Sequence, residues 1–375
     1  MNRRKFLTGT AAGAAGVAAL GLTGGAQAPA AGQAPAPCPA PGTAPAARGG
    51  GGGGRGARGG GAPAGPPPPA ALLGNPGAPP NVPAWKLARV SLMQLNFGSV
   101  LLPNSGVAAN TNQQYTVFDL PRVYVQHYGV HNIEFQLGNI QQCETDPNFT
   151  RQLKAKLDEY NVVCSQINME IGAGAGMTAD AAGRRAGIDR MKRWIPICNE
   201  LGCKRMMGNQ NQGSLFKERF PDAVAWMKEI ADACRPHGIM FSMETRGAGQ
   251  PAIPACSEGN PNPTPLVKDL GMKPWEFMYQ IFEAAGAHSN VDIGNVGAMN
   301  QQELHDCIKR WYPRSSGNMH IKSSNAWNIG EAVRFTEGLG YKGLYSIEVG
   351  VWAGQRMTLN QILANVKNQP GEYKP

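Results

Sequence analysis

Long hydrophobic runs are absent after the first 30 residues of this 375-residue chain. No later apolar stretch approaches the roughly 20 residues that a membrane-spanning helix needs, which excludes a polytopic membrane protein. No Gly-x-Gly-x-x-Gly or Walker-type loop follows any of the β-rich segments, so the usual signature of a nucleotide-binding doubly wound sheet is missing.

Cysteine is scarce and its pattern does not suit disulfides. Seven of the eight cysteines lie after residue 83, and no Cys-x-x-Cys pair occurs. An odd number argues against a complete disulfide framework. We expect most of these side chains to act as small buried apolar residues.

Acidic residues are missing from the first 83 positions. This segment carries six of the 35 basic residues, 21 of the 49 glycines and 15 of the 30 prolines. It therefore holds two thirds of the formal net charge of +9, and residues 84–375 carry only +3. A basic protein favours a nucleic-acid partner, but here most of the charge belongs to a leader and a linker. We expect no nucleic-acid partner.

The N-terminus has the three parts of an export signal. A basic start with Arg3 and Arg4 precedes an apolar stretch rich in Ala and Gly, and Ala26-Gln27-Ala28 follows as a small-x-small cleavage site. We predict that residues 1–28 are a twin-arginine signal peptide. A general secretory signal is the alternative, and cleavage after Ala30 is the second choice of site. Export implies a periplasmic or extracellular location and no transmembrane segment after processing.

Residues 29–83 are a low-complexity sequence of Gly, Pro and Ala. The stretch Gly49–Gly61 is almost entirely glycine, and Pro66–Pro69 is a short polyproline piece. Such segments bury too little apolar surface to offset the entropy of ordering them, so we expect a disordered linker. Residues 84–375 then form the folded domain, and they are numerous enough to bury a core of their own.

Short β-rich segments alternate with helical periodicity in this domain. The expected strands are Val90–Asn96, Asn132–Gln136, Val162–Asn168, Arg205–Gly208, Ile239–Glu244, Val291–Ile293, Asn318–Lys322 and Leu344–Glu348. The segments between them have helical spacing, with Gly238 as a helix cap and Pro196 as an expected interruption of a helix over residues 180–201. Eight alternations predict an α/β fold, a (β/α)8 TIM barrel, and an open doubly wound sheet is the rival.

The ends of the last four expected strands carry metal-binding residue types. Functional side chains of such barrels lie at the C-terminal ends of the strands, which here offer Glu244, Asp292, His320 and Glu348. Carboxylates in apolar strands need a partner, and three of them with one imidazole suit a divalent cation. Three oxygen ligands and one nitrogen favour Mn²⁺, Mg²⁺ or Co²⁺, with Zn²⁺ as the alternative.

On these residues the sequence resembles the xylose isomerase-like TIM-barrel superfamily over residues 90–350. The resemblance implies that the four residues hold one metal ion, as Glu, Asp, His and Glu do in epimerase-like members. It further implies a sugar or polyol substrate and an isomerase or epimerase reaction. Glu244 and Glu348 would exchange a proton through a metal-stabilised cis-enediolate. Facing the same mouth, the candidates to bind substrate are Arg246, Asn295 and Lys322.

Departures from the family pattern bear on the alternatives. After the sixth strand, Asn295 stands where many members of the family have a histidine. After the seventh strand, Lys322 is followed by Ser323, where the family often has Asp. The fourth strand has no histidine. The three-zinc site of the apurinic endonucleases therefore cannot be assembled in its usual form, which makes a nuclease-type hydrolase the weakest hypothesis. A non-catalytic carbohydrate-binding barrel, a polyol dehydratase and a homo-oligomer stay open. Glu134 matches a glutamate common on the second strand of the family, and a structural ion pair explains it equally well.

Overall fold

A computed structural model describes residues 78–98, 101, 115–169, 181–208, 220–244, 272–296, 301–322, 328–348 and 352–371. The chain divides into two units, Met1–Pro37 and Cys38–Pro375, and every described residue belongs to the second. The predicted signal peptide of residues 1–28 and the predicted linker up to residue 77 lie outside the described residues.

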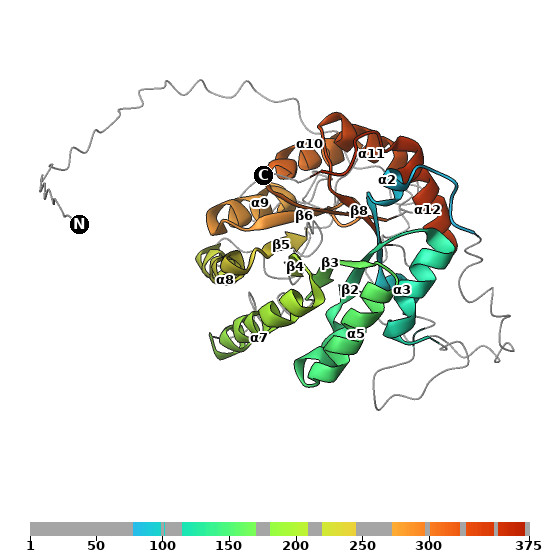
Figure 1. Ribbon diagram of the computed structural model, residues 1–375. Coiled ribbons are helices and arrows are strands. Elements are labelled where there is room, and N and C mark those ends of the chain that lie inside the picture. The colour runs from blue at the N-terminus through green and yellow to red at the C-terminus, as the bar shows by residue number, and fades with distance from the viewer. Residues whose placement is uncertain are drawn as a thin grey trace, which may run out of the picture. The chain divides into compact units, whose positions relative to one another are not determined.

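Eight parallel strands form a closed barrel in the order of the sequence, which confirms the predicted (β/α)8 fold (Figure 1). The first strand pairs with both the second and the eighth, so the sheet has no open edge. All eight strands end at the same rim of the barrel, where side chains from different strands meet. The strands are β1 Val90–Met93, β2 Asn132–Gln136, β3 Val163–Asn168, β4 Arg205–Gly208, β5 Met240–Glu244, β6 His288–Asp292, β7 Ser315–Ile321 and β8 Leu344–Ile347.

Helices surround the barrel on its outer side (Figure 1). They are α2 Ala84–Leu87, α3 Leu120–Val123, α4 Leu137–Ile140, α5 Pro147–Glu159, α7 Ala181–Leu201, α8 Phe220–Cys234, α9 Pro274–Ala285, α10 Gln301–Trp311, α11 Ile329–Gly338 and α12 Trp352–Asn365. None of these described helices is long and apolar enough to cross a membrane.

The expected helix over residues 180–201 is confirmed as α7, which continues through Pro196 to Leu201 and is not ended by this proline. A proline inside a helix removes one backbone donor. The buried side chains of Trp194, Ile195 and Cys198 pack this part of the helix into the core, which offsets that loss. The expected cap at Gly238 is confirmed, since Gly238 has a left-handed φ of 63° after α8 and its following turn.

Alternation along the strands separates two environments. In β7, Met319 and Ile321 belong to the apolar core between the strands and the helices. Asn318 and His320 are also fully buried, but successive side chains of a strand point to opposite faces, so these two lie on the other side of β7. Both contact Glu134 of β2 on the far side of the barrel. The interior near the rim is therefore polar.

The first strand is shorter than expected. It ends at Met93 rather than Asn96, because Gln94–Phe97 form a 3₁₀ turn. The Asn96 side chain leaves the ladder and donates to the Ile347 carbonyl oxygen at 2.6 Å.

The sixth strand begins earlier than expected, at His288 rather than Val291. His288, Ser289 and Asn290 pair with β5, although such polar residues are poor strand formers. Hydrogen bonds to the neighbouring strands in the closed barrel supply what the local propensity lacks. The same holds for β7, which begins at Ser315.

The described cysteines follow the expectation. The structure describes six cysteines, and all six are buried free thiols: Cys143, Cys164, Cys198, Cys203, Cys234 and Cys307. Burial raises the pKa of Cys143 to about 11 and that of Cys234 to about 12, which keeps these thiols protonated and unreactive at neutral pH.

A buried ion pair fastens the seam between the first and last strands. Arg89, directly before β1, lies 2.7 Å from Glu337 of α11, and neither side chain is more than 1% exposed. Arg89 Nε also donates to the Gly343 carbonyl oxygen at 2.6 Å. Glu337 accepts from the backbone N–H groups of Lys367 and Asn368 after α12. The ion pair thus links the start of β1 to the C-terminal segment.

We expect Arg89→Met to lower the free energy of unfolding by about 3–5 kcal/mol, because it leaves the Glu337 carboxylate buried without its cation. Guanidinium denaturation followed by circular dichroism measures this loss. The control is Arg122→Met, whose ion pair with Asp119 is half exposed and should cost no more than about 1 kcal/mol. Equal midpoints for the two variants would contradict a structural role for the Arg89 pair.

Candidate metal centre

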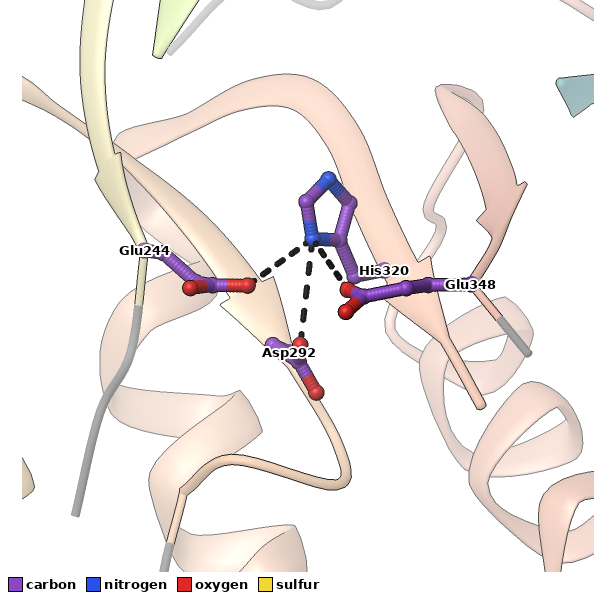
Figure 2. Close-up of side chains that lie close together, drawn as sticks. All are labelled: Glu244, Asp292, His320 and Glu348. Carbon is purple, nitrogen blue, oxygen red and sulfur yellow. Dashed lines mark hydrogen bonds and ion pairs between the residues drawn. The ribbon is translucent and has the colours of Figure 1, made fainter. Parts of the chain in front are cut away.

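Four side chains of metal-ligating types meet at the rim of the barrel. Glu244 ends β5, Asp292 ends β6, His320 lies near the end of β7, and Glu348 directly follows β8. Figure 2 shows the three carboxylates directed toward one nitrogen of the His320 ring. Asp292 and His320 are register partners on neighbouring strands. Glu244 pairs with Asn290, and His320 pairs with Ser346, two residues before Glu348, so all four residues lie at the C-terminal ends of adjacent parallel strands.

The distances define a single point of convergence at His320 Nδ1. This nitrogen lies 3.0 Å from Glu244 Oε1, 3.2 Å from Glu348 Oε2 and 3.8 Å from Asp292 Oδ2. His320, Glu244 and Asp292 are buried, whereas the Glu348 side chain is 18% exposed at the mouth. Glu348 is therefore the candidate ligand that solvent reaches most easily.

These donors fit a small divalent cation. Such ions bind oxygen and nitrogen at about 2.0–2.2 Å, so ligand atoms on opposite sides are about 4.0–4.4 Å apart. One ligand atom from each of the four residues lies within 4.8 Å of the others. Small side-chain rotations would bring all four to one ion.

Among the residues that the structure describes, this is the only group of three or more His, Cys, Asp or Glu ligands with such spacing. Strand β4 contributes Met206 and Met207 near this level and no histidine. The described part of the chain thus holds one candidate metal centre and no three-metal cluster.

Asp292 is held in place by the turn that follows β6. Its Oδ1 accepts from the backbone N–H of Gly294 at 2.7 Å and of Asn295 at 2.9 Å, which forms an Asx turn. The other oxygen, Oδ2, is the one that approaches His320. Asp292 is therefore a turn residue and a candidate ligand at once, because its two oxygens have separate tasks.

Lys322 lies against the candidate centre. Its Nζ is 2.8 Å from Asp292 Oδ2 and 2.9 Å from Glu348 Oε1. The aliphatic part of its side chain passes over Gly294, where a Cβ would lie 2.4 Å from Cγ and Cδ of Lys322. Only glycine leaves room for this path.

The surrounding charges determine the protonation of the site. Burial alone would lower the pKa of His320, but the Glu134 charge and hydrogen bonds with Asp292, Glu134 and Glu244 raise that pKa well above its ordinary value. Burial would raise the pKa of Asp292, but the Lys322 ammonium and His320 hold it well below its ordinary value. At neutral pH the chain itself therefore combines an ionised Asp292 with a protonated imidazole.

The opposite nitrogen of His320 contacts Glu134, which sequence reasoning did not include in the site. Glu134 Oε1 is 2.9 Å from His320 Nε2, and both side chains are fully buried. Two signals were available: the match to a glutamate common on the second strand of the family, and the position of Glu134 between the apolar residues Ile133 and Phe135. These signals indicate a buried carboxylate but do not identify its partner.

The candidate substrate-binding residues have three different outcomes. Arg246 lies outside the described residues. Asn295 lies in the turn beside Asp292 and contacts it through its backbone N–H. Lys322 reaches the mouth, but its ammonium contacts two of the candidate metal ligands.

Comparisons with solved structures show the same fold. Similar chains include a xylose isomerase-like TIM barrel protein from Mycobacterium smegmatis in complex with magnesium, with 14% identity, 75% of this chain and 98% of that chain covered, and a TM-score of 0.53. An IOLI protein with a bound zinc atom has 12% identity, coverage of 74% and 96%, and a TM-score of 0.51. The apo form of 3-keto-D-glucoside 4-epimerase YcjR from E. coli has 12% identity, coverage of 74% and 99%, and a TM-score of 0.50.

No curated protein matches the sequence significantly. The family described as "Xylose isomerase-like TIM barrel" matches residues 124–349, which is more than half of the chain and includes seven of the eight strands. The closed parallel barrel agrees with this match. The chain belongs to the xylose isomerase-like TIM barrel family.

Proposed function

We propose that the protein is a metal-dependent isomerase or epimerase of a sugar or sugar derivative. The observation that carries this proposal is the convergence of Glu244, Asp292 and Glu348 on Nδ1 of His320. The similar structures include a magnesium complex, a zinc-bound protein and a keto-glucoside epimerase, which supports the same proposal.

The four residues would hold one divalent cation. When bound, the cation supplies Lewis-acid polarisation of a substrate carbonyl and positive charge beside the enediolate oxygens. Mn²⁺, Mg²⁺ and Co²⁺ suit a set of three oxygens and one nitrogen, and Zn²⁺ is the alternative.

Glu244 and Glu348 are the proposed acid and base. They come from β5 and β8 and approach His320 from different sides (Figure 2). One carboxylate removes the proton from the carbon next to the carbonyl, and the other returns a proton to the cis-enediolate. Such positioned proton transfer contributes roughly 10²–10⁴-fold to the rate.

Lys322 has the charge and the location to assist. Its ammonium lies at the mouth, and the neighbouring Asp292 and Glu348 charges raise its pKa above the ordinary value despite partial burial, so it stays protonated. A fixed cation next to the base stabilises negative charge that develops on the substrate. Arg246 and Asn295 are proposed to bind substrate hydroxyl groups.

Export by the twin-arginine route is part of the proposal. It would deliver a folded protein to the periplasm or the extracellular space, where unphosphorylated sugars are the more natural substrates. A keto sugar or a 3-keto glycoside without phosphate is therefore the proposed substrate class.

Metal content is the first test. We expect about one Mn²⁺, Co²⁺ or Zn²⁺ per chain after gel filtration, measured by elemental analysis, and loss of this ion in Glu244→Gln. Glu303→Gln is the matched control, because it removes another buried carboxylate, which contacts Trp275 and Lys273 away from the site. Absence of a bound ion in the wild type, also after incubation with Mn²⁺ or Mg²⁺, would contradict the proposal.

Cation binding should also release a proton. Because the pKa of His320 is raised, its proton is present at neutral pH and a cation must displace it. The affinity for Mn²⁺ should therefore rise with pH, by up to about tenfold per unit, until the pH passes the pKa of His320. Calorimetric titration in two buffers with different ionisation enthalpies measures the proton count. A count of zero between pH 6 and pH 8 would be inconsistent with a protonated site.

The reaction itself is tested by isotope exchange. With Mn²⁺ in D₂O, the wild type should incorporate deuterium at the carbon next to the carbonyl of an unphosphorylated keto sugar, followed by NMR. Glu348→Gln should slow this exchange by about 10²–10⁴-fold at saturating Mn²⁺, because it removes one of the two proton carriers. Glu303→Gln should exchange like the wild type. Exchange no faster than with Mn²⁺ alone, across keto sugars and 3-keto glycosides, would favour a carbohydrate-binding barrel.

A further inference from the structure

A buried carboxylate lies directly below the candidate metal centre, on the inner side of the barrel. Glu134 of β2 is fully buried. Oε1 is 2.9 Å from His320 Nε2 and 3.0 Å from Gln166 Nε2. Oε2 is 3.0 Å from Asn318 Nδ2 and 2.7 Å from Ser346 Oγ. Four strands therefore meet at one side chain.

The hydrogen-bond roles follow from the chemistry of these groups. Two side-chain amide nitrogens and one hydroxyl can donate to Glu134, which is the arrangement that an ionised carboxylate requires, because it can only accept. The nitrogen of His320 that faces it must therefore donate, which places a proton on Nε2. The Gln166 amide nitrogen also lies near Nε2, but the distance of 3.4 Å is longer than the usual donor–acceptor distance of a hydrogen bond, so Glu134 is the closer partner.

We propose that Glu134 is a positioning residue that keeps the proton of His320 on Nε2 and thereby reserves Nδ1 for the cation. This inference rests on the proposed function, because it assigns the nitrogen that would bind the metal. A histidine with its second nitrogen bonded to a carboxylate has a fixed ring orientation and is a more basic ligand.

Glu134 also connects the two strands that carry His320 and Glu348. Asn318 lies two residues before His320 on β7, and Ser346 lies two residues before Glu348 at the end of β8. Both donate to Glu134 Oε2. One carboxylate thus holds the strands that carry two of the four candidate ligands, and it also orients the ring of one of them.

Two variants separate hydrogen bonding from charge. Glu134→Gln keeps the shape of the side chain and removes its charge. In either orientation of the amide, the new NH₂ group would face one of the groups that now donate to Glu134, so at least one hydrogen bond is lost. Glu134→Asp keeps the charge but withdraws the oxygens from Nε2. The readouts are the Zn²⁺ affinity, from competition with a chelator, and the ¹⁵N shifts of the His320 ring in the Zn²⁺-loaded protein, identified by their loss in His320→Gln.

We expect the wild type to have a protonated Nε2 and a Zn²⁺-bound Nδ1, and both Glu134 variants to bind Zn²⁺ about 10–100-fold more weakly. Glu303→Gln should match the wild type in both readouts. A Zn²⁺-bound Nε2 in the wild type would overturn the inference, and so would wild-type affinity in both variants. The wild-type ring shifts decide the question even where a variant does not fold.

Failure of the proposed function has a different signature. A wild type that binds Zn²⁺ through Nδ1 but exchanges no sugar proton would overturn the isomerase proposal and leave the role of Glu134 supported. A wild type that binds no Zn²⁺ would overturn both.

Discussion

Negative charge gathered at the end of the barrel is the constraint on which the rest of the site depends. Glu244, Asp292 and Glu348 all lie within 3.8 Å of one imidazole nitrogen, and two of them are buried. Like charges this close in a medium of low dielectric need positive partners nearby. Within the chain, His320 and Lys322 provide them, and in the proposed reaction a divalent cation shares the task. The protonation of His320 and the path of Lys322 are two responses to the same charge.

The strands of the barrel hold the charged groups of the site in fixed positions. Each candidate ligand lies on or next to a strand end, and residues in such positions keep their geometry better than residues in loops. Below the ligands, Glu134 connects four strands through hydrogen bonds. At the opposite end, the Arg89–Glu337 pair keeps β1 and β8 together. The polar interior therefore serves both the closed fold and the arrangement of the site.

The fold was predictable from the sequence because strand and helix patterns alternate eight times, and strand ends are where such barrels carry functional groups. The same logic brought Glu244, Asp292, His320 and Glu348 together. The role of Glu134 could not be derived, since it depends on which side chains meet across the barrel interior, and Glu134 and His320 are 186 positions apart. The early start of β6 was missed for a related reason, because His288–Asn290 are strand residues by virtue of their neighbours and not their propensity.

Gly294 links two positions that are distant in the sequence. The stem of Lys322 occupies the volume where any other residue at position 294 would place its Cβ. A side chain at 294 would push the ammonium away from Asp292 and Glu348, and the charge balance at the barrel rim would change with it. Among relatives of this chain, the two positions should consequently vary as a pair: a larger residue at 294 belongs with a shorter one at 322, and such proteins would need another counter-charge for their carboxylates.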